Sequence, residues 1–446
     1  MATRSKVKSA ADKSATAKKS AAVAVPEKKN KKHPKPPKPP KPPVPPPTPP
    51  PPISGQPIFG QPKPSPDPTG FKNPVTDGGI WGINQVSPVP VPTGGAVEPI
   101  LTLEQVYGST GAAKMAAIEA AGQIVFHSVG DTGSVNGPQT QSLVADKMLS
   151  DFDEANPADV PSFFFHLGDV VYYFGESTYY YDQFYEPYRD YPAPILAIPG
   201  NHDGVVYAKD TATTLQGFLE NFCTNAPVQS PDAGGLFRTT MIQPGVYFTL
   251  EAPFVRILGL YSNVLEDPGV ISGENGNNTI LDNRQINFLT AALTRVKTEK
   301  YAGAVIIAVH HPPFTGGATH GGSPLMLADI DSACTAAGVW PHAVFSGHAH
   351  NYQRFTRTVS GVQIPYIVAG CGGHDPLSVM NGTYRTPFPI DDTLTLENYD
   401  DMDFGYLRVI VNATTLTVEF HPESDGGTVK TPNDSVAVTL AGHVVS

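Results

Sequence analysis

The 446-residue chain has only three cysteines, Cys223, Cys334 and Cys371, and they lie far apart. Three scattered thiols exclude a disulfide scaffold and a metal site built from thiolates, although one disulfide with one thiol left over stays open. Long apolar runs are also missing, since none approaches the roughly 20 residues that a membrane-spanning helix needs. We therefore expect neither a disulfide framework nor a transmembrane segment.

Large apolar side chains are scarce in the first 80 residues. Residues 1–33 are rich in Lys, Ala and Ser without aromatics, and residues 34–52 are almost entirely Pro and Lys. Such a stretch cannot bury enough surface to offset the chain entropy lost on folding, and the proline run favours a stiff polyproline II spacer. We predict a disordered, basic and Pro-rich tail over residues 1–80, then an extended lead-in and a first helix over residues 81–121.

The net charge of −11 hides an asymmetry between the tail and the rest of the chain. Residues 1–52 carry Arg4 and twelve lysines against Asp12 and Glu27, which gives +11 for the tail and leaves −22 for the remainder. The acidic remainder argues against specific nucleic-acid binding by that part. The tail has the charge to contact polyanions, but a solvated linker is the simpler interpretation of its composition.

Apolar runs alternate with helix-like stretches after about residue 100. Thr102 with Gln105 three residues later has the pattern of a capping box and predicts a helix to about Ala121. A second helix is expected over residues 283–300, where Ile286, Leu289, Leu293 and Val296 share a face. The runs that predict strands are Ile124–Val129, Ser162–Leu167, Pro194–Ile198, Val255–Leu260, Ala304–Val309, Ala343–Phe345, Ile364–Ala369, Tyr406–Val411, Thr415–Phe420 and Val436–Leu440. This order predicts an α/β sheet covered on both sides and completed by a second sheet.

Five short blocks of polar residues each follow one of the expected strands. They are Gly130-Asp131-Thr132-Gly133, Gly168-Asp169-Val170-Val171-Tyr172, Gly200-Asn201-His202-Asp203, His310-His311-Pro312-Pro313 and Gly347-His348-Ala349-His350. The ends of successive strands meet at one edge of an open α/β sheet, so these blocks are expected to form one site, with their glycines allowing tight turns. Oxygen and nitrogen donors without thiolates indicate two adjacent hydrolytic metal ions.

As a set, the blocks resemble the calcineurin-like metallophosphoesterase superfamily, and within it they are most similar to the purple acid phosphatases. The similarity covers roughly residues 122–421. It implies an α/β fold with a two-sheet αββα sandwich, and residues 122–446 as the catalytic domain. Such families are often exported. The chain as written shows no standard signal peptide, because its apolar stretch at residues 21–25 is too short, so the compartment stays open between export and the cytoplasm.

The resemblance implies two metal ions, Fe(III) together with divalent Fe, Zn or Mn. One ion would be held by Asp131, Asp169, Tyr172 and His350. The other would be held by Asp169, Asn201, His310 and His348. Asp169 is the expected bridging ligand, because one carboxylate at a strand end can hold two cations about 3.5–4 Å apart. His311 is the alternative to His310.

Two positions place the chain nearest to the purple acid phosphatases. Most calcineurin-like enzymes carry a histidine ligand two residues after the first aspartate, and this chain has Gly133 there. Tyr172 stands three residues after Asp169, where purple acid phosphatases have the phenolate that binds ferric iron. A hard, anionic phenolate suits a trivalent ion better than imidazole does. The change at 133 and the tyrosine at 172 therefore compensate one another.

Further residues have expected roles through the same resemblance. His202 corresponds to a histidine that contacts the phosphate group, and Asp203 would fix its tautomer and help keep it protonated. His320, in a Gly-rich stretch, is a candidate acid or substrate contact, with a solvent-facing loop histidine as the alternative. His374 could line the pocket. The two histidines expected to be core residues are His127 and His166.

The predicted function is hydrolysis of phosphate monoesters, with a small-molecule substrate, by a metal-bound hydroxide at a binuclear centre. Two alternatives remain. One is a phosphodiesterase or nucleotidase that uses the same site, with loops 204–246 and 263–282 deciding which ester fits. The other is a polyanion- or surface-binding protein centred on the basic tail.

Overall fold

The computed structural model describes residues 89–153, 155–206, 213–263, 269–272 and 282–446. The chain divides into two units, Met1–Pro51 and Pro52–Ser446, and every described residue belongs to the second unit. The predicted tail over residues 1–80 lies outside the described residues, as do parts of the loops expected to select the ester. Within the described ranges, no helix has both the length and the apolar character required to cross a bilayer.

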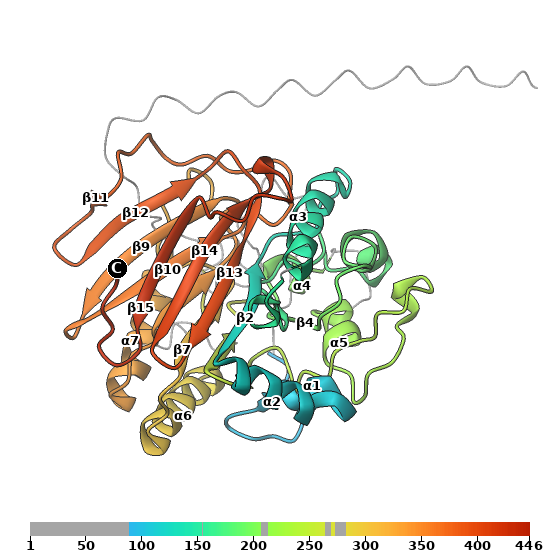
Figure 1. The fold of residues 1–446 in the computed structure, drawn as a ribbon, viewed down its shortest axis with the longest axis horizontal. Helices are drawn as coiled ribbons and strands as arrows, with labels where there is room; N and C mark the ends of the chain where they lie inside the picture. Colours follow the sequence, from blue (N-terminus) through green and yellow to red (C-terminus); the bar gives the residue numbers. More distant parts are fainter. Residues whose placement is uncertain (1–88, 154, 207–212, 264–268, 273–281) are drawn as a thin grey trace, which may run out of the picture. The chain divides into compact units, whose positions relative to one another are not determined.

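The described residues form two β-sheets (Figure 1). The smaller sheet has the strand order β15-β14-β13-β2-β3-β4, and its strands β2, β3 and β4 are parallel to one another. Its members are β2 (Gln123–Val129), β3 (Phe164–His166), β4 (Ile195–Ala197), β13 (Gly405–Asn412), β14 (Thr415–Pro422) and β15 (Asp434–Thr439). The carboxyl ends of the parallel strands therefore share one edge.

The larger sheet has the order β1-β5-β6-β7-β8-β10-β9-β12-β11, with β6, β7, β8 and β10 parallel. Its members are β1 (Ile100–Thr102), β5 (Phe248–Ala252), β6 (Val255–Leu260), β7 (Ala304–Val309), β8 (Ala343–Ser346), β9 (Tyr352–Val359), β10 (Val362–Ala369), β11 (Phe388–Pro389) and β12 (Leu394–Asp400). The strands predicted at Val255–Leu260 and Ala304–Val309 have the observed bounds of β6 and β7.

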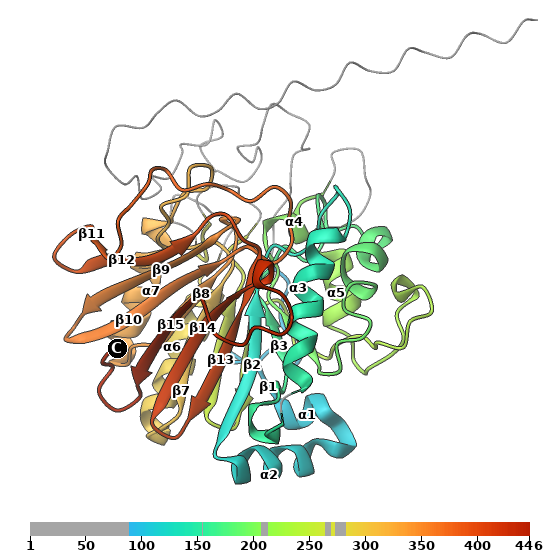
Figure 2. The same cartoon turned by 45° about the horizontal axis from the view of Figure 1, so that its top comes forward.

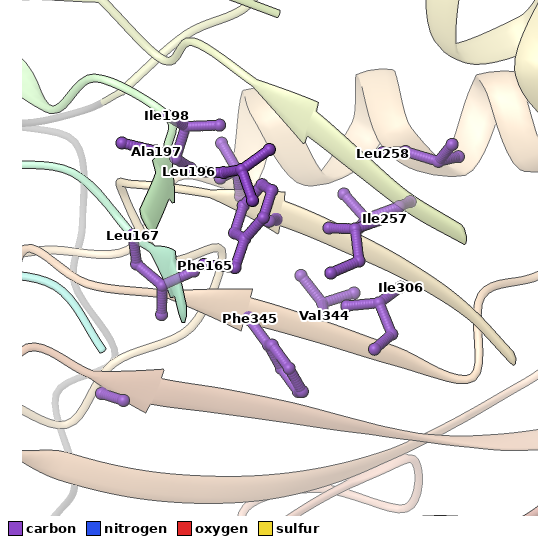
Figure 3. Packing of buried hydrophobic residues seen from close by; sticks show 14 of the residues in the cluster. Phe165, Leu167, Leu196, Ala197, Ile198, Ile257, Leu258, Ile306, Val344 and Phe345 are labelled. Carbon is purple, nitrogen blue, oxygen red and sulfur yellow. The ribbon is translucent and has the colours of Figure 1, made fainter. Parts of the chain in front are cut away.

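Side chains from the two sheets meet in one hydrophobic core (Figure 3). Phe165 of β3 and Phe248 of β5 have ring centroids 6.2 Å apart, which is aromatic contact distance across the two sheets. The parallel strands are buried on both faces, as the unbroken burial of β6 and β7 shows. This pattern explains why these strands read as continuous apolar runs in the sequence.

Helices cover the outer faces of the two sheets (Figures 1 and 2). Helix α6 (Arg284–Glu299) packs on β6 and on α7 (Pro324–Ala337), while α3 (Gln139–Ser150) packs on β13. The remaining helices are α1 (Leu103–Tyr107), α2 (Gly111–Ala121), α4 (Asn201–Gly204) and α5 (Gln216–Phe222). The predicted α/β fold with an αββα sandwich is confirmed.

The first predicted helix is interrupted. The capping box at Thr102 and Gln105 is present, but α1 ends at Gly108, whose φ of 56° lies in the left-handed region that glycine adopts readily. Helix α2 then begins at Gly111. The prediction of one helix to Ala121 was therefore wrong, because the glycine ends the first turns. Strand β1 precedes these helices and pairs with β5, so it belongs to the larger sheet.

Candidate metal centre

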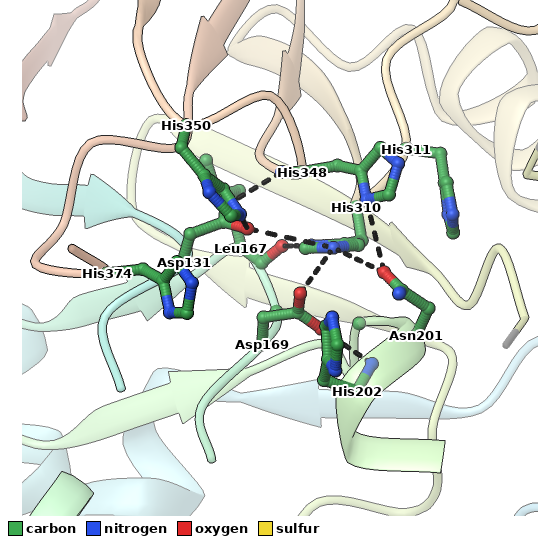
Figure 4. A network of polar contacts seen from close by, with 12 residues as sticks. Asp131, Leu167, Asp169, Asn201, His202, His310, His311, His348, His350 and His374 are labelled. Atoms are coloured by element: carbon green, nitrogen blue, oxygen red, sulfur yellow. Dashed lines mark hydrogen bonds and ion pairs between the residues drawn. The ribbon is translucent and has the colours of Figure 1, made fainter. Parts of the chain in front are cut away.

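The five polar blocks follow β2, β3, β4, β7 and β8, and the structure brings them together at one end of the sandwich (Figure 4). Asp131 follows β2, Asp169 follows β3 and Asn201 follows β4. His310 follows β7 directly, and His348 and His350 follow β8. The expectation that strand ends would gather these side chains is thus met, because the parallel strands of both sheets end at this edge.

The first group of donors surrounds the phenol of Tyr172. Its oxygen lies 3.1 Å from Oδ1 of Asp131, 2.9 Å from Oδ2 of Asp169 and 3.3 Å from Nε2 of His350. Nε2 of His350 is in turn 3.4 Å from Oδ1 of Asp131. These are the four side chains that the resemblance implied for one metal ion, and the structure brings all four together.

The second group surrounds Nε2 of His310. This atom lies 3.3 Å from Oδ2 of Asp169 and 3.2 Å from Oδ1 of Asn201. Nδ1 of His348 approaches the same Asn201 oxygen to 3.1 Å. Donor atoms of Asp169, His310 and His348 all lie within 4.8 Å of one another. Oδ2 of Asp169 belongs to both groups, as a bridging ligand requires.

These spacings suit metal coordination. Ligand atoms bound at about 2.1 Å and at right angles lie about 3 Å apart, which is close to the 2.9–3.4 Å measured within the two groups. Asp131 and Asp169 are both fully buried, and buried carboxylates need compensating positive charge. The residues present therefore fit two cations.

Three of the side chains in the two groups sit on left-handed backbone. Asp131, Asp169 and His348 have φ values of 56°, 54° and 67°, a region that costs free energy for residues other than glycine and that clusters at functional sites. We expected the glycines that precede these residues to allow the backbone to turn tightly. At Gly200 a glycine is required for another reason, because the backbone passes close to Asp169 and a Cβ there would collide with Oδ1 of Asp169.

Electrostatics at the site follow from burial and from the two carboxylates. Burial, together with the charges of Asp131 and Asp169, raises the pKa of the Tyr172 phenol well above its ordinary value. Burial opposes protonation of His310, but the negative charges of Asp169 and Asp131 outweigh it and raise the pKa of His310 to about 9. A cation at the phenol oxygen is therefore needed to hold Tyr172 as a phenolate.

The direction of the His310 ring is set by the backbone. Nδ1 of His310 lies 2.8 Å from the carbonyl oxygen of Leu167, so this nitrogen donates and Nε2 is left to face Asp169 and Asn201. Nδ1 of the alternative, His311, lies 2.7 Å from Oγ of Ser262, and the centroid of the tilted His311 ring lies 4.1 Å from that of His348. The geometry favours His310 as the ligand.

The hydrogen bonds of Asp203 differ from the expected one to the His202 ring, because they go to the backbone. Its carboxylate accepts hydrogen bonds from the backbone N–H groups of Gly200, at 2.8 Å, and of Val170 and Val171, at 3.1 and 3.3 Å. It folds back as the third residue of a short helix and satisfies the N–H of the capping residue. Nδ1 of His202 faces the Tyr173 carbonyl oxygen at 2.9 Å, a residue to which the sequence analysis gave no role.

The two more distant candidates, His320 and His374, both reach the site. The ring of His320 lies 4.4 Å from that of His348 and 5.1 Å from that of His350. The ring of His374 stacks on Tyr172 at 3.9 Å. Burial, with a smaller effect of His350, lowers the pKa of His374 to about 3. His320 is half-buried and His374 is buried.

A cavity of about 590 Å³ opens beside Tyr172. The residues that line it include the aromatic Tyr172, Tyr173, Phe174 and Tyr179 and the acidic Glu176, Asp182 and Glu186. Gln183, which the sequence analysis did not single out, also lines it. A lone glutamine in an aromatic-rich segment gives no signal in the sequence.

The two-sheet sandwich, with donor side chains gathered at its strand ends, defines the class of metallophosphoesterase folds. A family model described as "Calcineurin-like phosphoesterase" matches residues 128–352, half of the chain, and the chain belongs to this family. A second model, "Iron/zinc purple acid phosphatase-like protein C", matches residues 364–430. The predicted resemblance to this superfamily and to its purple acid phosphatases is confirmed.

Individual relatives are distant. The chain is 23% identical over 336 residues to "Probable inactive purple acid phosphatase 9" of Arabidopsis thaliana, a match that covers 69% of this chain and 48% of the relative. The chain thus spans about half the length of that curated relative. A purple acid phosphatase from yellow lupin (Lupinus luteus) matches with a TM-score of 0.49 and 18% identity, over 71% of this chain and 54% of that one. GAP50 of Plasmodium matches with a TM-score of 0.46 and 13% identity, over 68% and 86%.

Proposed function

We propose that the chain hydrolyses phosphate monoesters at two adjacent metal ions, Fe(III) and a divalent Fe, Zn or Mn. The observation that carries the proposal is the pair of donor groups that share Oδ2 of Asp169, one of them centred on the Tyr172 phenol. When bound, the metal ions supply positive charge for the phosphate oxygens and lower the pKa of a water molecule that attacks phosphorus.

The side chains around the metal groups have separate tasks in this proposal. His202 stabilises the phosphoryl oxygens, supported by its position 4.4 Å from the Tyr172 ring and its slight exposure of 8%. His320 protonates the departing alkoxide, supported by its contacts with the rings of His348 and His350. Asp203 acts on this site through the backbone, by holding the N–H groups on both sides of the ligand loops.

The cavity beside Tyr172 bears on the choice between esters. Its volume falls within the range of about 300–1,000 Å³ that small-molecule pockets have, so the organic part of a substrate fits there. Its carboxylates, including Glu176 and Asp182, repel a leaving group that carries further phosphates. This charge favours monoesters of uncharged or cationic alcohols over nucleotides. A phosphodiesterase is the second candidate, because the cavity has room for one alcohol group of a diester.

The test is hydrolysis of a chromogenic phosphate monoester and of its diester by metal-loaded protein from acid to neutral pH. We expect dominant monoester turnover at acid pH, and we expect Asp169→Asn and His348→Ala each to lower kcat/KM by more than about 100-fold. The matched control is Asp146→Asn, an exposed carboxylate on α3. Full activity in either ligand variant would contradict the proposal. Dominant diester turnover would move it to a phosphodiesterase.

Loss of activity is the further alternative, because the Arabidopsis relative is named as inactive. That name describes that protein. In this chain, all seven proposed ligands lie in the two donor groups. Two bound metals with no turnover of either ester would favour this alternative.

A further inference from the structure

The backbone of Tyr172 is held by a single buried side chain. The N–H of Tyr172 donates to Oε1 of Gln183 at 2.8 Å, and the carbonyl oxygen of Tyr172 accepts from Nε2 of Gln183 at 2.9 Å. One amide group thus satisfies both polar groups of one residue. The phenol oxygen at the other end of Tyr172 lies between Asp131 and Asp169, so the position of Gln183 sets where that oxygen sits.

Gln183 is itself fixed in place. Its exposed fraction is 4%, and it lies in the short helical segment η5 (Tyr181–Tyr185). Its backbone carbonyl oxygen accepts a 2.6 Å hydrogen bond from Nε2 of Gln141, a fully buried residue of α3. The two hydrogen bonds between Gln183 and the Tyr172 backbone, which we call the clamp, are therefore connected to helix α3.

Gly133 leaves the space that Gln183 occupies. A Cβ at position 133 would collide with Oε1 of Gln183 and lie 2.6 Å from the carbonyl oxygen of Val170. The carbonyl oxygen of Gly133 also lies 2.9 Å from Nδ1 of His374, whose ring stacks on Tyr172. The absence of a side chain at 133 thus serves the backbone clamp, and its carbonyl holds the ring that packs on the phenol.

We propose that Gln183 is a positioning residue for the Tyr172 phenol, and that Gly133 is required because any side chain there would displace the Gln183 amide. The histidine usual at position 133 and the tyrosine at position 172 are then mutually exclusive for a steric reason. This inference rests on the proposed function, in which Tyr172 is a ligand of the ferric ion.

The chain offers two glutamines with the same chemistry away from Tyr172. Gln243 holds Ala197 with hydrogen bonds of 2.8 and 2.8 Å, and Gln285 holds Tyr261 with hydrogen bonds of 2.8 and 2.8 Å. Both are as buried as Gln183, with exposed fractions of 2% and 3%. Replacing one of them removes an equal number of hydrogen bonds without touching the phenol, which makes it a matched control.

The experiment compares Gln183→Leu, Gln183→Glu and Gln243→Leu in the full chain loaded with iron. The readouts are metal content, thermal unfolding and the phenolate-to-iron charge-transfer band. We expect Gln243→Leu to lower stability and leave the band in place, while Gln183→Leu shifts or removes it. Gln183→Glu keeps the acceptor for the Tyr172 N–H and loses the donor, so its band changes less than that of Gln183→Leu. An unchanged band in a folded, iron-bound Gln183 variant would overturn the proposal.

A double substitution tests the steric link. Gly133→Ala displaces Gln183 in the wild-type chain, so it changes the band more there than in a Gln183→Ala background. Groups that act through one contact give such non-additive effects. Simple addition of the two changes would contradict the role assigned to Gly133.

A metal-free measurement separates this inference from the proposed function. NMR records the ¹³Cζ resonance of Tyr172 in the metal-free wild type, Gln183→Leu and Gln243→Leu. The resonance is identified as the one that is missing in Tyr172→Phe. If wild type binds iron without a charge-transfer band, the phenolate assignment is wrong, and the resonance alone then decides on positioning. Movement only in Gln183→Leu supports the clamp, and no movement refutes it.

Discussion

Asp203 stands next to His202 in the chain, yet its carboxylate faces the backbone instead. Its two oxygens collect N–H groups from the loops after β3 and before α4, and burial, with the charge of Asp169, raises its pKa to about 7. Those loops carry Asp169 and Asn201, so one side chain joins two ligand-bearing segments. Its effect on chemistry would be indirect.

We expect Asp203→Ala to destabilise the fold by at least about 2 kcal/mol, because it leaves several buried N–H groups without their acceptor. Asp203→Asn keeps an acceptor oxygen and should cost less. Urea unfolding measures the stability, and metal content of each variant shows whether the two loops still present their ligands. Equal stability of the Ala and Asn variants would mean that the backbone finds other partners.

The sequence predicted which residues gather at the site better than it predicted which groups their side chains contact. All seven proposed ligands could be selected because a motif preserves residue type and spacing, and both depend on the chain alone. The orientation of Asp203 could not, since it depends on a capping bond within α4 and on N–H groups of another loop. Gln183 gave no signal for the same reason, as its partner lies across a turn.

A second polar network joins elements far from the metal groups. The buried Asp151, which follows α3, accepts hydrogen bonds from Tyr406 of β13 at 2.6 Å and from Lys430 at 2.7 Å. It also lies 3.0 Å from Nε2 of His127 on β2. Burial opposes ionisation of Asp151, but hydrogen bonds from His127, Lys430 and Tyr406 outweigh it and lower the pKa of this carboxyl below its ordinary value.

The network should make stability sensitive to acid. A lowered carboxyl pKa contributes stability above the unfolded value of about 3.9, and this contribution is lost as pH falls below it. Burial lowers the pKa of His127. Stability therefore also falls as the pH drops below about 6.5, because the unfolded chain then binds the proton more readily than the folded one.

We expect Asp151→Asn to cost about 2–3 kcal/mol near neutral pH and less below about pH 4. Tyr406→Phe, which removes one hydrogen bond, is the milder control. Calorimetry across pH measures the difference in stability between the wild type and Asp151→Asn, and an equal difference at neutral and acid pH would contradict the expectation.

Elements with continuous or regular apolar patterns were predicted well, including the amphipathic helix α6 at Arg284–Glu299, which matches the helix expected over residues 283–300. Elements with diluted patterns were predicted poorly. Strands β6 and β7 are buried on both faces and could be read from their unbroken apolar runs. Helix α3 buries Gln141 and Lys147 beside apolar residues, so its pattern is diluted. Strand β12, which lies between β9 and the short edge strand β11, buries only Leu394 and Leu396, and its pairing with β9 is decided by the tertiary fold.

Each proposed metal position draws ligands from both sheets. Asp131, Asp169 and Asn201 follow strands of the smaller sheet, whereas His310, His348 and His350 follow strands of the larger one. A cation at either position would therefore connect the two layers of the sandwich. Ligand binding to the folded state alone raises stability, by about 4 kcal/mol when the free metal exceeds its Kd 1,000-fold.

Chelation should accordingly lower the melting temperature of the metal-loaded chain, and by an amount that grows with the metal concentration before chelation. The Asp169→Asn variant, lacking the bridging carboxylate, should respond much less. Differential scanning calorimetry with and without chelator measures both. Equal melting temperatures of the loaded and stripped wild-type chain would show that the layers do not depend on the ions.

Tyr172 has a further consequence, because the same residue belongs to a donor group and lines the cavity. A molecule that enters the cavity lies beside the residue whose phenol oxygen faces the proposed metal position. With Tyr172 bound to iron as proposed, the visible colour would then change as a small molecule enters, before any bond is broken. The molecule would carry its own optical indicator of occupancy, readable by eye or by spectrophotometer without a label.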